Sequence, residues 1–135
     1  PRAPIGTAIQ SCIPAGGGGT DATSTALETL ASGRPIAVMP EGRITPRDQR
    51  DPDGMGPFRS GYIDIARQAN AHILPVALIN SDDVWGSRAK LPRMHPFRRP
   101  KVTLGTGTPI HLGDRDDAAI EAEVRTQMAS ILARA

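Results

Sequence analysis

The sequence predicts an α/β fold with a mostly parallel central sheet flanked by helices. Short apolar runs of strand length alternate with segments whose apolar residues recur at helical spacing. A strand, helix, strand order implies a parallel pair with a right-handed crossover, and this order occurs twice before residue 80. A chain of 135 residues can bury a core of its own, so we expect a single domain over residues 1–135.

The composition excludes several classes of protein. A formal net charge of +2 is too small to predict nucleic-acid binding. Cys12 is the only cysteine, which excludes a disulfide or a cysteine-based zinc site within the chain and suits a reducing compartment. No apolar run approaches the roughly 18 to 20 residues of a membrane span, and the amino end lacks the features of a signal peptide. We therefore expect no membrane crossing, and the start at Pro1 suggests a processed or truncated piece.

The first strand is predicted at residues 5–13, which are rich in small and β-branched side chains. Four glycines follow at residues 16–19. Glycines that open a helix can cradle a phosphate with bare N–H groups, but this run fits neither the dinucleotide fingerprint nor a P-loop. A flexible connection and an anion cradle both remain open.

A helix and a second strand come next. Thr20 or Asp21 is expected to cap the helix, and Gly33 to end it. The apolar positions on one helical face are Ala22, Ala26, Leu27, Leu30 and Ala31. The run at residues 36–39 has no polar alternation, which predicts a short strand buried on both faces and ended by Pro40.

The junction after this strand is the candidate site. Glu41 and Arg43 flank Gly42, which lets the backbone turn or approach a ligand closely. Open α/β sheets bind ligands at the carboxyl ends of their strands. From spacing alone, an ordinary turn with a solvated glutamate and arginine is equally compatible with the pattern.

The next unit repeats the topology. Residues 45–57 contain too many prolines, glycines and charges for regular structure, and we expect a long surface loop. A helix is predicted over residues 62–70, followed by a buried strand within residues 72–80 that has Pro75 near its beginning. The helical residues expected to face inward are Tyr62, Ile65, Ala66 and Ala69.

The last third of the chain begins with a basic segment, residues 84–101. Such a segment, with apolar residues interleaved, could lie on an anionic membrane or grip phosphates, and a solvated loop is the alternative. A short strand is expected at residues 102–104. A final helix should begin at Asp114, with Asp117 in a reciprocal capping arrangement. Its apolar stripe comprises Ile120, Val124, Met128, Ile131 and Leu132.

Familiar catalytic motifs are missing. No Gly-x-Ser-x-Gly occurs, so a hydrolase elbow is not supported. His72, His95 and His111 lie far apart in the sequence and at no metal-ligand spacing. We therefore expect a structural or surface role for each histidine and predict no metal site.

Three blocks in order resemble the glycerolipid acyltransferase family. They are Met39-Pro40-Glu41-Gly42-Arg43, then Phe58-Arg59-x-Gly61, then Leu74-Pro75-Val76-Ala77-Leu78. The wider match Pro40 to Thr45 is similar to the branch that reacylates lysophosphatidylethanolamine. The resemblance covers about residues 13–79 well and 102–110 loosely. It implies that the chain is the carboxyl-terminal majority of such a domain.

The resemblance implies an acyltransferase. The family moves a fatty acyl group from acyl-CoA or acyl-carrier protein to a lysophospholipid hydroxyl, and a His-x-x-x-x-Asp block supplies the base. That block lies upstream of a strand like residues 5–13, so the catalytic pair is expected outside this chain, which alone should be inactive. The only formal match, His111 with Asp116, falls at the wrong end of the order, and we interpret it as coincidence with a helix-capping aspartate.

The resemblance also implies the substrate-binding residues. They are Pro40, Glu41, Gly42, Arg43, Phe58, Arg59 and Gly61. Arg43 or Arg59 would pair with the head-group phosphate, because a planar guanidinium can engage two oxygens at once. Ala15 and Gly16 replace an arginine common in the family, which argues against a simple lysophosphatidic acid acceptor.

The implied partners are a lysophospholipid-type acceptor, an acyl thioester donor and a membrane surface, with no nucleic acid. No cofactor is expected beyond the thioester co-substrate, and the implied location is cytoplasmic and peripheral at the membrane. Two other interpretations remain. One is a non-catalytic lipid- or phosphate-binding module derived from this fold, and the other is a nucleotide-binding domain that uses the glycine run.

Overall fold

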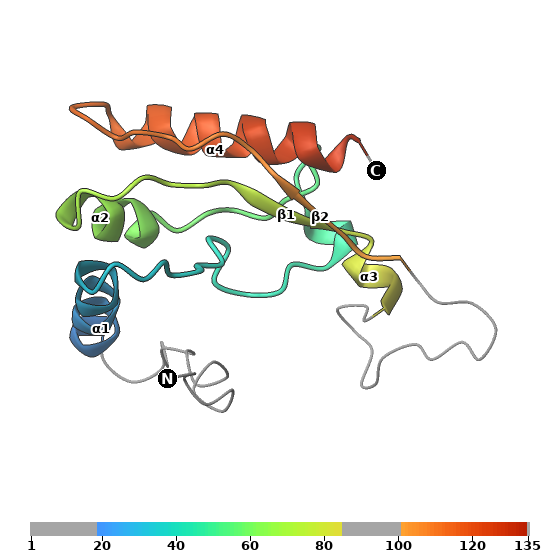
Figure 1. Cartoon of the computed structure of the whole chain (residues 1–135). Helices are drawn as coiled ribbons and strands as arrows, with labels where there is room; N and C mark the ends of the chain where they lie inside the picture. The colour runs from blue at the N-terminus through green and yellow to red at the C-terminus, as the bar shows by residue number, and fades with distance from the viewer. Residues whose placement is uncertain (1–18, 85–100, 135) are drawn as a thin grey trace. The chain divides into compact units, whose positions relative to one another are not determined.

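The computed structural model describes residues 19–84 and 101–134, with side chains from residue 22 onward. The chain divides into two compact units, Pro1–Ala37 and Val38–Ala135. The described part of the first holds helix α1 (Gly19–Ala31), and the other elements belong to the second (Figure 1). The predicted strand at 5–13, the glycines at 16–18 and most of the basic segment lie outside the described residues.

Helix α1 ends as the sequence predicts. Gly33 adopts a φ of +76°, a conformation that favours glycine. Its N–H donates to the carbonyl of Leu30 at 2.9 Å, and the N–H of Arg34 donates to the carbonyl of Thr29 at 3.3 Å. These two bonds form a Schellman cap, which satisfies carbonyls that the helix leaves without partners. The helix begins at Gly19, so the predicted caps Thr20 and Asp21 lie inside its first turn.

The predicted strand at residues 36–39 is not formed. These residues have no assigned regular structure, and Met39 is 79% exposed. A strand exists only through hydrogen bonds to a neighbour, and the two residues that flank this run, Pro35 and Pro40, have no backbone N–H to donate. The expectation of a strand buried on both faces is therefore wrong here.

The sheet of the second unit is antiparallel and has two strands. Strand β1 (Val76–Ile79) pairs with β2 (Thr103–Thr106), with Leu78 opposite Leu104. Ala77 and Ile79 are buried, whereas Val76 and Leu78 are exposed. The predicted mostly parallel central sheet, with strands buried on both faces, is wrong for the described residues. An apolar run looks alike whichever direction its partner takes, so the sequence did not reveal the pairing.

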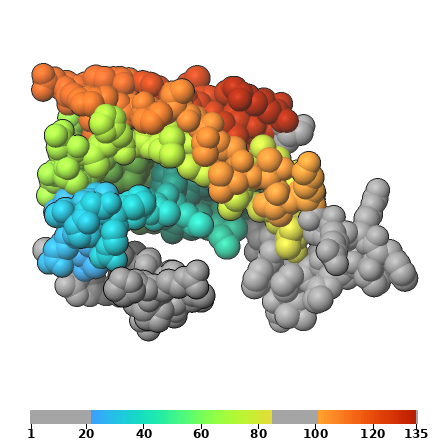
Figure 2. Space-filling model, in the orientation of Figure 1, coloured from blue at the N-terminus to red at the C-terminus, as the bar shows by residue number. Residues whose placement is uncertain are grey.

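Helix α4 (Asp117–Leu132) covers one face of this sheet. It contacts both strands, and Ile131 packs against the inward residues Ala77 and Ile79. Figure 2 shows α4 as a continuous layer over the strands and over helix α2 (Gly61–Gln68). The larger core cluster comprises Ile63, Ala66, Ile110, Leu112, Ile120 and Val124, with Phe58, Tyr62, Ile73 and Met128 against it. The apolar stripe predicted for α4 is thus confirmed.

Two details of the helices differ from expectation. In α2 the fully buried residue is Ile63, which the predicted inward face omitted. Helix α4 begins at Asp117 rather than Asp114, and Asp116 occupies its N-cap without a side-chain capping bond. Asp117 instead accepts a hydrogen bond from Arg67 of α2 at 2.5 Å. The predicted reciprocal capping pair is therefore wrong, because an arginine on another helix binds this carboxylate.

Gly105 of β2 allows α4 to approach the sheet. A Cβ at this position would overlap the side chain of Ile131. We expect Gly105→Ala to lower the free energy of unfolding by about 1 to 3 kcal/mol, because an overpacked contact forces the helix away.

Chemical denaturation measures this loss. Gly61→Ala at the start of α2 is the matched control, since a Cβ there meets nothing within 4 Å. An equal effect of both substitutions would contradict the packing explanation.

Candidate functional site

The candidate site is built on a tight turn over residues 39–42. The N–H of Gly42 donates to the carbonyl of Met39 at 3.0 Å, and Gly42 has a φ of +64°. Pro40 suits the second position of the turn because its φ is already fixed. Glycine is favoured at residue 42 because a side chain would be strained at this φ.

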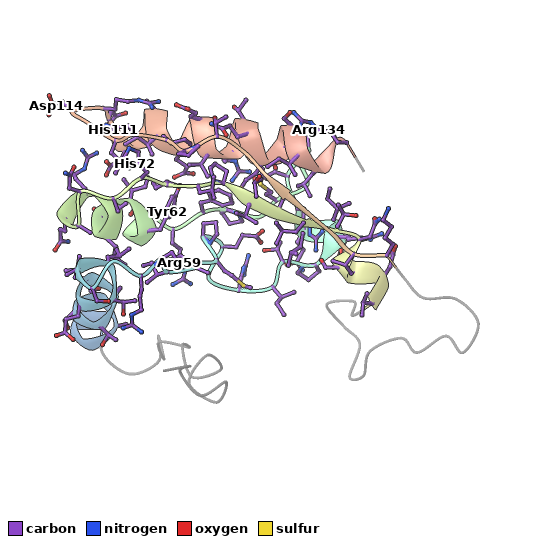
Figure 3. All side chains as sticks on the ribbon, viewed as in Figure 1. Arg59, Tyr62, His72, His111, Asp114 and Arg134 are labelled. Carbon is purple, nitrogen blue, oxygen red and sulfur yellow. The ribbon has the colours of Figure 1, made fainter. Side chains whose placement is uncertain are left out.

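A backbone hydrogen bond joins the turn to the second sequence block. The N–H of Arg59 donates to the carbonyl of Pro40 at 2.8 Å. The Arg59 side chain, labelled in Figure 3, lies close to Gly42, where a Cβ would stand 3.0 Å from Nε and 3.1 Å from Cδ of Arg59. The structure thus brings together Pro40, Gly42 and Arg59, which the sequence analysis assigned to one site.

Glu41 has a structural role in this turn. Its carboxylate accepts a hydrogen bond from the hydroxyl of Thr45, which is only 2% exposed. A Cβ on Gly56 would lie 2.6 Å from Oε2 of Glu41, so the buried Gly56 makes room for this pair. The glutamate therefore binds the start of the loop 45–57, and Gly56 near the end of the loop lies close to this pair.

The loop is also tethered to the segment after β1. Arg50 donates to the carbonyl of Thr45 at 2.9 Å and forms an ion pair with Asp82 at 3.1 Å. Arg47 binds the same carboxylate at 2.9 Å. Burial raises the pKa of Asp82, but the two arginines outweigh burial and leave that pKa below its usual value. The loop contains a short 3-10 helix, Arg47–Gln49, and otherwise lacks regular structure, as predicted.

Arg125 of α4 holds the other end of the loop. Its guanidinium contacts Asp53 Oδ2 at 2.6 Å, Asp51 Oδ2 at 3.0 Å and the carbonyl of Gly56 at 3.0 Å. It also lies over the ring of Phe58, with Cζ 4.8 Å from the centroid. A planar, charged fork can make all of these contacts at once. Arg125 therefore positions Phe58, the residue directly before Arg59.

Charge separates the arginines of the described region into two groups. Those that bind carboxylates are Arg47, Arg50, Arg67, Arg115 and Arg125. Within the part of the chain that the structure describes, Arg34, Arg43, Arg59 and Arg134 form no ion pair with a carboxylate, and all four are exposed; of these, Arg43 and Arg59 belong to the sequence blocks of the candidate site. Two cations without a partner thus lie at or beside the Gly42 turn. Such a turn can attract a phosphate or another anion.

Tyr62 carries a buried hydroxyl beneath this region. Its ring meets Phe58 edge to face at 6.4 Å, and among the described residues its Oη has no hydrogen-bond partner. Burial, followed by the negative charge of Glu121, raises the pKa of Tyr62 to about 12. Gly61 begins α2 immediately before it, in open space. Tyr62 therefore acts as a packing residue held in its neutral form.

His72 and His111, which are 39 residues apart in the sequence, lie together. The rings of His72 and His111 are 4.9 Å apart. The sequence could not predict that these histidines are neighbours, because an antiparallel bridge between distant segments brings them together. The described residues contain no group of three or more histidine, cysteine, aspartate or glutamate side chains that could hold a metal ion.

Comparison with known proteins finds a family match over residues 16–79. The family model described as Acyltransferase matches residues 16–79, which include all three sequence blocks. The sequence-based recognition is thus confirmed. No curated protein and no solved structure matches the chain. Strand β2 and helix α4, with Arg125, lie beyond the matched segment.

The Arg125 contacts predict a loss of stability on substitution. We expect Arg125→Ala to lower the free energy of unfolding by about 1 to 3 kcal/mol, because Asp53 and the Gly56 carbonyl lose a charged donor. Amide hydrogen exchange should accelerate at Gly54 and Met55, while Arg125→Lys should be intermediate because an ammonium cannot fork. Arg134→Ala is the control, with an exposed side chain, and should stay within about 0.5 kcal/mol.

Tyr62 makes a prediction about pH. It is the only tyrosine, so the absorbance of tyrosinate reports its ionisation directly. The native chain should titrate near pH 12, and the chain in denaturant near about 10. Because the folded pKa is the higher one, this contribution to stability is complete below about pH 10 and is lost as the pH rises toward 12. A native titration near 10 would mean that the hydroxyl is solvated.

Proposed function

Residues 16–79 carry an acyltransferase-family segment, and from this premise we propose that the protein transfers a fatty acyl group from a thioester to a lysophospholipid hydroxyl. The observation that supports this acceptor is the pair of unneutralised cations, Arg43 and Arg59, at the Gly42 turn. A lysophospholipid presents a phosphate close to its free hydroxyl. Binding the phosphate at the turn would fix the position of that hydroxyl.

Each proposed binding residue has a distinct task. Arg43 and Arg59 bind the head-group phosphate. Gly42 has no side chain, and this leaves room for the Arg59 side chain beside the turn. Pro40 and Glu41 shape the turn through the Arg59 N–H and the Thr45 hydroxyl. Phe58 transmits the position of Arg125, and Gly61 begins the helix that follows.

The reaction requires a base. The acceptor oxygen forms an ester bond to the acyl carbonyl carbon while the carbon–sulfur bond breaks, and the hydroxyl proton passes through the base to the departing thiolate. We assign the base to a His-x-x-x-x-Asp block, which the 135 residues contain only as His111 and Asp116. Because His111 faces His72 and Asp116 is the N-cap of α4, we keep this pair out of the mechanism.

A peripheral membrane location is part of the proposal. Among the described residues no helix is both long and apolar enough to cross a bilayer. The apolar side chains on either side of the turn, Met39 and Ile44, are 79% and 73% exposed. Exposed apolar groups beside unpaired cations suit contact with an anionic lipid surface, where the acceptor would reside.

The alternative is a non-catalytic lipid- or phosphate-binding module. The same two cations, Arg43 and Arg59, support it, because they would bind a phosphate whether or not a reaction follows. The two candidates differ only in whether an ester is formed. Transfer measured with a chain extended upstream to include the block separates them, because a binding module would bind the acceptor without acylating it.

Kinetics of the extended chain test the role of the arginines. We expect Arg43→Ala and Arg59→Ala each to raise the KM for a lysophospholipid by about 10-fold or more, with a smaller effect on kcat. Arg134→Ala, which changes an exposed arginine near the end of α4, should leave both constants unchanged. The 135-residue chain should bind the acceptor and show no transfer.

Two outcomes would count against the proposal. A fall in kcat at unchanged KM would move the arginines from acceptor binding to stabilisation of the transition state. Transfer by the 135-residue chain itself would place the base within it and refute its assignment to an upstream block.

A further inference from the structure

His72 and His111 face each other across a well-defined backbone pairing. The N–H of Ile73 donates to the carbonyl of Ile110 at 3.0 Å, and the N–H of Ile110 donates to the carbonyl of Ile73 at 2.7 Å. Ile73 and Ile110 are therefore a hydrogen-bonded antiparallel pair, and both pack in the core. The next residues outward, His72 and His111, form a non-hydrogen-bonded pair on the opposite face. In such pairs the side chains come closest.

The ring geometry suits a shared ligand. The ring centroids are 4.9 Å apart, and the planes are inclined by 73°. Two imidazoles that bind one cation through nitrogens at about 2.0 Å, with an angle of roughly 90° to 110° between them, place their centroids about 4.5 to 5.2 Å apart. The observed centroid separation falls inside this interval, so the two backbone segments already hold the rings at a distance that one shared cation can span.

The surroundings also allow binding. Both histidines are exposed, and Figure 3 shows them close to the start of α4, with Asp114 at the same end. Gly113 turns the chain beside His111 with a φ of +52°, and a Cβ on it would stand 3.8 Å from Nδ1. Rotation about the side-chain bonds of the two exposed rings can direct one nitrogen of each toward a common point.

We propose that His72 and His111 together bind one divalent transition-metal cation of the zinc type, each through one imidazole nitrogen, with water in the other positions. Neutral imidazole is a favoured ligand for such cations, whereas magnesium and calcium prefer oxygen. The described residues add no third ligand of the usual kinds, so this site is simpler than a four-ligand structural zinc site.

The expected consequence of cation binding is a cross-link between two distant segments of the chain. The cation would join the segment before β1 to the segment after β2 directly above the Ile73 and Ile110 pair. Both isoleucines belong to or pack on the core cluster that contains Ile63 and Ile120. A ligand that binds only the folded state shifts the folding equilibrium toward it. Binding should therefore raise the stability of the second unit without any part in acyl transfer.

The test uses the full chain, freed of any affinity tag, with ZnCl₂ as the probe. Calorimetric titration should give one cation per chain, and the midpoint of thermal unfolding should rise as the concentration of zinc increases. His72→Ala or His111→Ala should weaken binding by about 100-fold, because the two ligands no longer act together. His95→Ala and Cys12→Ser, which change the third histidine and the only cysteine, should leave it unchanged.

A second variant separates binding from folding. His72→Phe keeps an aromatic ring opposite His111 and removes the ligand nitrogen, so the zinc-free stability should be preserved while the zinc-dependent rise is lost. Three results would overturn the proposal: no binding by the native chain, binding that survives His72→Phe, or binding that is lost with His95→Ala or Cys12→Ser. In those cases the two rings form only a cross-strand aromatic pair.

Discussion

The candidate site depends on the contacts that Arg125 makes with the loop 45–57. The loop 45–57 has little regular structure, so few of its backbone groups are organised by a helix or a sheet. Arg125 supplies an alternative anchor by binding Asp51, Asp53 and the carbonyl of Gly56 from one side chain of a regular helix. Helix α4 thereby fixes the position of the irregular loop 45–57.

A short series of contacts connects Arg125 with the turn at Gly42. Arg125 stacks on Phe58, the next residue donates its N–H to Pro40, and its side chain then crosses Gly42. The links are the Arg125–Phe58 contact, the peptide bond from Phe58 to Arg59, and the hydrogen bond from Arg59 to Pro40, so we expect a displacement of α4 to shift the turn. The acyltransferase-matched segment ends at residue 79, yet the position of its loop depends on a helix that begins at Asp117. The family motif is thus incomplete as a structural unit without the rest of the second unit.

Local features were predictable from the sequence and distant pairings were not. Gly33 ends α1 and the apolar stripe of α4 is buried because both depend on residues within a few turns. The direction of β2, the unpaired state of residues 36–39 and the meeting of His72 with His111 all depend on which remote segment lies alongside. Arg125 belongs to the same class, since an arginine in a helix gives no sign of the loop that it will bind. The order of the motifs predicted the site residues. It did not predict the contacts of Arg125 that hold the loop beside them.

Pairing of charges explains how the two kinds of arginine in this region differ. An arginine that holds a loop must be neutralised, because an unpaired cation packed against the chain would lose solvation without compensation. Arg50 and Arg125 satisfy this condition through Asp82 and Asp53. Arg59 is exposed and has no carboxylate among the described residues, although its aliphatic stem is held over Gly42. The hydrogen bond from its N–H to Pro40 places its backbone while its charge remains available, and that combination suits recognition of a phosphate.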